Sequence, residues 1–382
     1  MRKLLTVLAG VVSALLVAVP AFGAVFPFTC EKTISAGQDL DALVNSDSPT
    51  TATNFCVNAG TYQVSDPAVI YDGDQISGPV GSVLKHGPAR YGAPKAKLVG
   101  DTTPRVIGGN GSNISIRWLD VSGGDGEYDF DRDPATCGGR DPCPMNGTGV
   151  GVHLGPTDGT TVVEYVYTHH NDAPGIGGAH GHIKYNRAAF NGQDPVFLGW
   201  SAAGIMGYVE YEASYNYVHD NKGNGIYSTN AHSVTGDDPL MASNPGGGFW
   251  YRQNVLVNNS RWGLRYEITP YDIAEGEHSP SPSLQACSNR IAGNGTATSY
   301  GGASTADAQN AVWCSNTFGK QTIGGVAYSA NRSGVALQIH DSGQAHRTDT
   351  WNIVARNNTL NGEVITNCDL PDEVALCEGN IR

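Results

Sequence analysis

The chain has 382 residues, of which 50 are glycine, and its formal net charge is −13 at pH 7. An acidic surface repels phosphate-rich partners, so nucleic acid and anionic membrane surfaces are poor candidates for binding. Charged residues make up only 15% of the chain, and this composition favours a turn-dense β protein over a helical one.

Residues 1–23 predict a secretory signal peptide. Arg2 and Lys3 give a positive start, an apolar core follows over residues 4–19, and residues 21–23 (Ala-Phe-Gly) form a small-x-small cleavage site. A transmembrane anchor is the alternative, but the apolar stretch is somewhat short and a proline ends it. We therefore expect a secreted or cell-surface protein without membrane insertion.

The next segment, residues 24–62, predicts an N-terminal cap and a first strand. Residues 38–45 place three apolar side chains on one helical face, which indicates a short amphipathic helix. The apolar run at residues 55–62 indicates a strand. Residues 63–382 then predict the body of a single domain together with its C-terminal cap.

A short pattern recurs along this body: an asparagine, an apolar stretch and a second asparagine five positions later. Self-similarity at intervals of roughly 30 to 40 residues indicates a solenoid. The runs between turns are short and β-rich, as at residues 209–215 and 248–251, and the glycine content argues against two helices per repeat. We therefore expect a parallel β-helix, in which stacked turn asparagines hydrogen-bond from coil to coil. The copies are Asn186 to Asn191, Asn216 to Asn221, Asn254 to Asn259 and Asn289 to Asn294, with looser copies at Asn316 and Asn358.

The eight cysteines fit an oxidising compartment, because an even number in a secreted chain indicates disulfides. In a solenoid, cysteines that are neighbours in sequence lie within one or two coils and are natural partners. This proximity predicts four pairs: Cys30 with Cys56, Cys137 with Cys143, Cys287 with Cys314, and Cys368 with Cys377.

Three segments resemble a known family. Residues 167–176 contain His-His-Asn and end in Gly-Ile, residues 217–226 contain His-Asp-Asn-x-Gly-x-Gly-Ile, and residues 258–268 contain Asn-Ser-x-x-Gly-Leu-x-Tyr-Glu-Ile. They resemble coils of the secreted right-handed parallel β-helix repeat proteins of the pectate-lyase-like superfamily. The resemblance implies an all-β, single-domain right-handed parallel β-helix whose short N-terminal helix caps the first coil. It also implies an extracellular polysaccharide as partner, while the reaction stays open because the best-known pectate lyase and polygalacturonase motifs are absent.

Ionisable side chains are concentrated on the coils around these segments. Equivalent positions on adjacent coils lie about 5 Å apart, so residues distant in sequence are expected to line one groove. β-Elimination from a uronate needs a base for the C5 proton, an acid for the leaving oxygen and a cation near the carboxylate. His219 or His170 would be the base, a second histidine the acid, and Lys222 or Arg265 the cation. The candidate catalytic residues are His170, Asp172, His219, Asp220, Lys222, Arg265 and Glu267.

Two other functions stay open at this point. Hydrolysis needs two carboxylates roughly 5 to 9 Å apart, which Asp172 with Asp220, or Asp220 with Glu267, would supply. A non-catalytic cell-surface or matrix protein would instead bind carbohydrate through a flat strip of aromatic side chains, although such side chains equally suit the corners of the coils. Insertions between the repeats are expected to gather on one side and build the binding face of a monomer.

An acidic loop provides a second signal. Its carboxylates alternate with other residues, and hard oxygen ligands at this spacing favour calcium. The loop lacks the glycine and the distal glutamate of an EF-hand, and a merely solvated acidic loop is the alternative. The predicted Cys137–Cys143 pair would hold the loop in either case. The candidate metal ligands are Asp125, Glu127, Asp129, Asp131 and Asp133.

Overall fold

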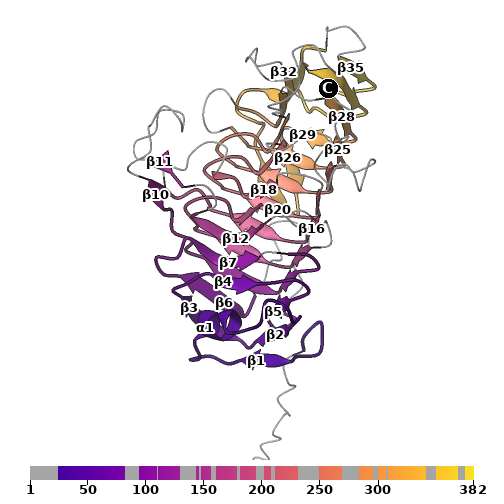
Figure 1. The fold of residues 1–382 in the computed structure, drawn as a ribbon. Helices are drawn as coiled ribbons and strands as arrows, with labels where there is room; N and C mark the ends of the chain where they lie inside the picture. Colours follow the sequence, from indigo (N-terminus) through magenta and orange to yellow (C-terminus); the bar gives the residue numbers. More distant parts are fainter. Residues whose placement is uncertain are drawn as a thin grey trace, which may run out of the picture.

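The protein is an elongated stack of parallel strands, seen in Figure 1 as a computed structural model in which the chain advances from β1 at one end to β35 at the other. Three long parallel sheets make up the stack, and α1 (Leu40–Asn45) is the only α-helix among the described residues. The predicted fold, an all-β right-handed parallel β-helix with a short N-terminal helix, is confirmed. The structure describes residues 25–81, 94–109, 111–129, 143–145, 148–155, 161–178, 181–194, 202–207, 211–230, 249–268, 284–295, 300–306, 309–340, 350–368 and 375–382.

A regular coil contributes one strand to each of three sheets, which we call A, B and C in the order in which the chain visits them. Sheet A contains β1 (Lys32–Ile34), β2 (Asn54–Val57), β5 (Gln75–Ser77), β8 (Ser115–Arg117), β13 (Val162–Glu164), β16 (Gly181–Lys184), β19 (Tyr211–Ser214), β22 (Phe249–Arg252), β25 (Leu284–Cys287), β28 (Gln309–Cys314), β33 (Trp351–Arg356) and β35 (Ala375–Glu378). Sheet B contains β3 (Gly60–Val64), β6 (Ala96–Gly100), β9 (Leu119–Ser122), β14 (Tyr167–His169), β17 (Arg187–Ala189), β20 (Tyr217–His219), β23 (Val255–Val257), β26 (Arg290–Ala292) and β29 (Thr317–Phe318).

The third sheet and two antiparallel strand pairs complete the fold. Sheet C contains β4 (Ala68–Ile70), β7 (Arg105–Gly109), β12 (Val150–Leu154), β15 (Ile176–Gly177), β18 (Ile205–Gly207), β21 (Ile226–Asn230), β24 (Leu264–Ile268), β27 (Ala303–Ala306), β32 (Val335–His340) and β34 (Val364–Thr366). The antiparallel pairs are β10 (Tyr128–Asp129) with β11 (Cys143–Pro144), and β30 (Gln321–Ile323) with β31 (Val326–Tyr328).

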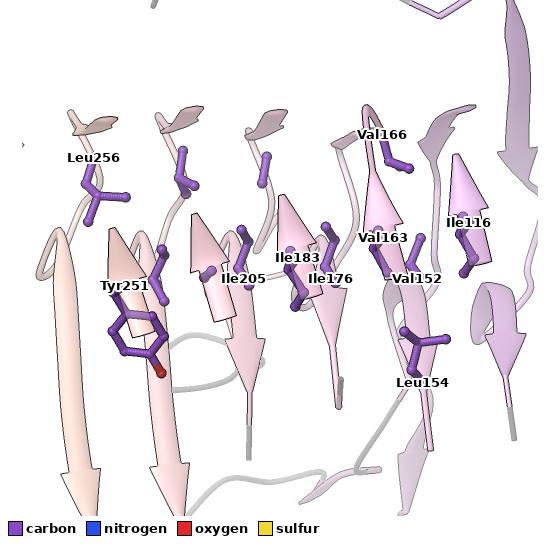
Figure 2. Packing of buried hydrophobic residues seen from close by; sticks show 14 of the residues in the cluster. Ile116, Val152, Leu154, Val163, Val166, Ile176, Ile183, Ile205, Tyr251 and Leu256 are labelled. Carbon is purple, nitrogen blue, oxygen red and sulfur yellow. The ribbon is translucent and has the colours of Figure 1, made fainter. Parts of the chain in front are cut away.

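The core forms because inward side chains of successive coils align in rows, as Figure 2 shows for β-branched and leucine residues. On sheet A, Ile116 pairs in register with Val163, and Val163 pairs with Ile183. On sheet C, Ile176 pairs with Ile205. All five side chains are essentially fully buried, and each row therefore removes apolar surface from water continuously along the stack.

The predicted asparagine stacking exists as two ladders, one at each end of the sheet B strands. At the turn from sheet A to sheet B, Asn216 donates its side-chain amide both to the Ile183 carbonyl and to Oδ1 of Asn254 in the next coil. The same Oδ1 also accepts the backbone N–H of Asn216. These bonds pair buried polar groups that would otherwise be costly. We call this row ladder 1: Asn186, Asn216, Asn254, Asn289, Asn316, Asn358 and Asn380.

The second row, ladder 2, lies at the turn from sheet B to sheet C and ends differently. Its last asparagine, Asn331, donates its backbone N–H and its amide to the two carboxyl oxygens of Glu363, at 2.6 and 2.9 Å. Glu363 is only 2% exposed, and burial raises the pKa of its carboxyl above the usual value of 4.5. The members of ladder 2 are Asn171, Asn191, Asn221, Asn259, Asn294, Asn331 and Glu363.

The N-terminal cap and the disulfides agree with the sequence in most details. The helix starts at Leu40, two residues later than predicted, because Asp39 is its N-cap and accepts the Ala42 N–H at 3.1 Å. Three predicted disulfides are present: Cys30–Cys56, Cys287–Cys314 and Cys368–Cys377. The fourth pair involves Cys137, which lies outside the described residues, as does the predicted signal segment 1–23.

The insertions leave the stack at two corners, and not on one side as expected. Long connections join sheet B to sheet C between β9 and β12 and between β29 and β32. Others join sheet C to sheet A between β21 and β22 and between β24 and β25. In the described part of the chain, no helix has the length and apolar character needed to cross a membrane.

Candidate functional site

The outward face of sheet B brings together ionisable residues from four coils. Strand side chains alternate between the core and the outside, so the residues that flank the buried Thr168 of β14 point outward. In register, Asp120 of β9 pairs with Tyr167, Tyr167 pairs with Arg187, and Arg187 pairs with Tyr217. A second outward row contains Ser122, His169, Ala189 and His219.

A chain of three hydrogen-bonded side chains crosses the first two of these strands. Nε2 of His169 lies 2.8 Å from Oδ1 of Asp120, and Nδ1 of His169 lies 2.7 Å from Nδ1 of His170. A carboxylate accepts, so His169 donates from Nε2, and its Nδ1 then accepts the Nδ1–H of His170. This assignment leaves a lone pair on Nε2 of His170, which has no hydrogen-bond partner among the described residues.

His170 is presented to solvent by the turn that leads into ladder 2. Its backbone has φ of 53°, in the left-handed region, and the next residue is the fully buried Asn171. The side chain is exposed. Partial burial and then the neighbouring His169 hold the pKa of the His170 imidazole below 6.5. His170 is therefore neutral at neutral pH, with its basic nitrogen directed away from the relay.

A second histidine, His219, is held in a different state. Arg187 donates its Nε–H to Nε2 of His219 at 2.9 Å, and Nδ1 of His219 lies 2.5 Å from Oδ2 of Asp220. His219 is 4% exposed, and burial is the main cause that lowers its pKa, with the charge of Arg187 acting in the same direction. His219 is thus a neutral imidazole with both ring nitrogens engaged.

Aromatic rings connect the two histidine units. The guanidinium of Arg187 lies 4.4 Å from the centroid of the Tyr167 ring, a distance at which a cation is attracted to a ring face. Phe190 lies between the histidines, with ring centroids 5.4 Å from His170 and 5.6 Å from His219. Burial raises the pKa of the Tyr167 phenol, so this hydroxyl stays protonated at neutral pH.

The other predicted residues of the sheet B to sheet C turns lie beside this face. Oδ2 of Asp172 accepts the N–H of Gly126 at 3.0 Å. Burial and the adjacent Asp125 raise the pKa of the Asp172 carboxyl. Lys222 is exposed, and its backbone N–H donates to the carbonyl of Asn191. These residues extend the polar surface next to His170 and Asp220.

Arg265 and Glu267 belong to a different face. Both lie on β24 of sheet C, where Nη2 of Arg265 is 2.7 Å from Oε2 of Glu267. The hydroxyl of Tyr227 donates to the same Glu267 oxygen at 3.0 Å. The turn at Asn259 separates this strand from sheet B, so the candidate residues are divided between two sheets and do not line one groove.

The acidic loop is described only in part. Asp125 and Glu127 lie in the described segment, the backbone of Asp129 forms part of β10, and Asp131 and Asp133 lie outside the described residues. Among the described residues, no three or more His, Cys, Asp or Glu side chains gather as metal ligands. The calcium site stays a prediction.

The sequence predicted five of the residues on or beside the sheet B face and missed the rest. Asp120, Tyr167, His169, Arg187 and Tyr217 were not among its candidates. For Arg187 and Tyr217 the signal was in the asparagine pattern, because the two ladders bracket β17, β20, β23 and β26. Counting outward from them, the first and third residues after a ladder 1 position point outward, as Tyr217 and His219 do after Asn216.

Comparisons with known proteins support the fold class. No protein-family model matches the chain, and no curated protein sequence matches it. Among solved structures, the tailspike gp49 of the Acinetobacter baumannii bacteriophage Fri1, a capsular polysaccharide depolymerase, is similar with a TM-score of 0.50 at 9% identity, over 93% of this chain and 63% of that one. The protein is thus a right-handed parallel β-helix protein.

Two further solved structures are similar over most of their length. The A-module of the mannuronan C-5 epimerase AlgE6 from Azotobacter vinelandii matches with a TM-score of 0.46 at 14% identity, over 94% of this chain and 97% of that one. The catalytic unit of an α-1,3-glucanase from Streptomyces thermodiastaticus matches with a TM-score of 0.44 at 15% identity, over 94% of this chain and 69% of that one. These structural neighbours are polysaccharide-active β-helix proteins.

Proposed function

We propose that this protein is a secreted or cell-surface enzyme that cleaves an acidic polysaccharide by β-elimination on the outward face of sheet B. The observation that carries the proposal is the Asp120–His169–His170 relay, which ends in an exposed, neutral imidazole nitrogen. A general base needs a fixed orientation, a defined tautomer and a pKa near or below the working pH. The relay supplies the orientation and the tautomer of His170, and partial burial together with His169 lowers its pKa.

In the proposed step, Nε2 of His170 removes the proton from C5 of a uronate unit. The electron pair of the C5–H bond forms the C4=C5 double bond, and the C4–O bond to the next sugar breaks. The leaving oxygen takes a proton from an acid, for which the protonated phenol of Tyr167 is our candidate. The positive charge of Arg187 beside these groups stabilises the negative charge that develops on the uronate carboxylate.

The carboxylates of this face favour elimination over hydrolysis. Hydrolysis needs one carboxylic acid and one available carboxylate. Asp120 already accepts from His169, and Asp220 accepts from His219. Asp172 accepts the backbone N–H of Gly126. These contacts reserve the three carboxyl groups for orienting other groups.

The aromatic residues argue against a purely carbohydrate-binding protein. Trp118, Tyr165, Tyr185 and Tyr215 form a row at the turn between sheets A and B, with successive ring centroids 4.3, 5.2 and 5.0 Å apart and nearly parallel planes. Rings that stack on each other offer their edges, and not their faces, to a sugar. The row therefore fills the corner of the coils.

An assay with two readouts tests the proposal. The purified protein would be incubated with a panel of neutral and uronate-containing polysaccharides, with calcium or with a chelator. Elimination is expected to give the ultraviolet absorbance of an unsaturated uronate together with new reducing ends. Reducing ends without absorbance would mean hydrolysis, and no product across a broad panel would mean a binding protein. Loss of activity in chelator would support the calcium prediction.

A further inference from the structure

The antiparallel pair β30–β31 folds back over the outward face of sheet B. It is inserted between β29 of sheet B and β32 of sheet C. The hydroxyl of Tyr328 lies 3.2 Å from the hydroxyl of Tyr217, although 111 residues separate them in sequence. Ile323 and Tyr328 also form a buried apolar cluster with Val255, Val257, Ala292 and Tyr217. The hairpin thus covers β20, β23 and the Ala292 end of β26, whereas Arg290 of β26 is exposed.

Because of this cover, the two ends of the outward face of sheet B differ in how exposed their side chains are. At the N-terminal end, the outward side chains of Thr61 and Gln63 on β3 and of Lys97 on β6 are exposed. Beneath the hairpin, Val255 is 5% exposed and Val257 is fully buried. Among the described positions, a saccharide that lies along sheet B towards its N-terminal end therefore meets exposed side chains on β6 and β3, beyond the buried Asp120 and Ser122 of β9. Towards the hairpin it meets the covered strands β20 and β23 before the exposed Arg290 of β26.

The hairpin also contacts the site itself. Tyr217, which it holds through Tyr328, stacks on His219 with ring centroids 4.2 Å apart. The guanidinium of Arg187 lies 6.0 Å from the same Tyr217 ring. Tyr328 is thus a positioning residue for the cation and for the neutral histidine. Two strand spacings, about 10 Å in all, separate β14, which presents His170, from β20, where the cover begins.

We propose that the β30–β31 hairpin is an end wall of the polysaccharide-binding face, and that the enzyme therefore cuts near one end of its substrate chain. The long part of the chain would lie over the N-terminal coils, across β9, β6 and β3. Only a short saccharide would fit between His170 and the hairpin, and it would be released as a small product. This inference rests on the proposed function and specifies how the substrate lies on the same site.

The test compares product sizes early in the reaction on a uronate polysaccharide that the protein cleaves. The wild-type protein is expected to release short oligosaccharides from the start, while the chain length of the remaining polymer falls slowly. Replacing residues 321–328 by a short glycine-serine turn is expected to give products of many sizes and a rapid loss of viscosity. Tyr328→Ala keeps the hairpin backbone and provides a milder variant, expected to shift the profile in the same direction. His182→Ala, on the outward side of sheet A, is the matched control and is expected to keep the wild-type profile.

The outcomes separate this inference from the proposed function. Products of many sizes from the wild-type protein would overturn the end wall while leaving elimination intact. An unchanged profile in both hairpin variants, with thermal unfolding showing that they are folded, would also overturn it. The absence of any cleavage would overturn the proposed function and the end wall together.

Discussion

Nε of Arg187 donates a hydrogen bond to Nε2 of His219, 2.9 Å away, and this contact decides what His219 can do. A nitrogen that accepts from a guanidinium cannot at the same time take a proton from a substrate. From the sequence alone, His219 and His170 are equal candidates for the base. In the structure only His170 offers an exposed nitrogen, and His219 is better suited to hold Arg187 in place.

Replacing His170 tests the base directly. His170→Ala is expected to lower kcat by about 10²- to 10⁴-fold, the usual contribution of a positioned base. The His182→Ala variant should keep wild-type activity, because this exposed histidine lies on sheet A and contacts Glu212. Initial rates from the absorbance of the unsaturated product would measure both. Equal rates for wild type and His170→Ala would remove His170 from the mechanism.

Asp120 is expected to act through His169 and not on the substrate. Asp120→Asn keeps the size of the side chain but removes the carboxylate that fixes the tautomer of His169. We expect kcat to fall by about 10²-fold or more, with little change in KM. Nuclear magnetic resonance of the histidine side chains should show a changed tautomer at His169. A lower kcat with unchanged histidine spectra would contradict the relay.

The pH dependence of stability follows from the buried histidines. Burial, with a smaller effect from Arg105, lowers the pKa of His153 to about 4. The unfolded state binds this proton at a higher pH than the folded state does. The contribution of His153 to the free energy of unfolding is therefore fully present above about pH 6.5 and is lost as the pH falls towards 4. The loss is roughly 3 kcal/mol for this residue. Urea unfolding between pH 7 and 4 should be flatter for His153→Gln, and parallel curves would refute the assignment.

The activity profile should have an acid limb below pH 6.5. The base must be neutral to accept a proton, and the pKa of His170 is lowered by burial and by His169. The rate constant kcat/KM is therefore expected to rise with pH, with the midpoint of the rise below 6.5, and to reach a plateau that extends through neutral pH. A midpoint well above 6.5 would require another base.

Interrupting an asparagine ladder should lower the free energy of unfolding. Oδ1 of Asn254 accepts two bonds from Asn216, and its amide donates to Ala213 and to Asn289. Asn254→Ala leaves several buried groups unpaired at about 1–3 kcal/mol each, so we expect a loss of at least about 3 kcal/mol in the free energy of unfolding. Gln63→Ala, an exposed change on β3, should cost less than about 0.5 kcal/mol. Chemical unfolding of both variants would show whether the difference exists.

The sequence was informative wherever a position repeats from coil to coil. Asn186, Asn216 and Asn254 marked the turns, so the solenoid, its short strands and three disulfide pairs followed from spacing. The strand predicted at residues 209–215 is β19, Tyr211–Ser214, and the strand predicted at 248–251 is β22, Phe249–Arg252.

The site was harder to predict because each coil has three faces. His219 and Glu267 were expected to be neighbours, since their motifs occupy consecutive coils. The turn at Asn259 directs Glu267 onto sheet C, whereas His219 faces outward from sheet B. The role of His170 depended on Asp120, which lies on the preceding coil, 49 residues before His169, and belongs to no motif. Only the strand register brings that carboxylate to His169.

Glu363 determines which hydrogen bonds the last position of ladder 2 can offer to a further coil. Every asparagine in ladder 2 both accepts and donates, so each coil offers a hydrogen-bonding template for the next one. The carboxyl group of Glu363 accepts two bonds from Asn331 and, unlike an asparagine side chain, has no amide hydrogen to pass on. A further coil, or the first coil of a second molecule, would therefore meet no donor at this corner. Glu363 thus acts as a chemical stop that discourages end-to-end growth of the β-helix into fibres.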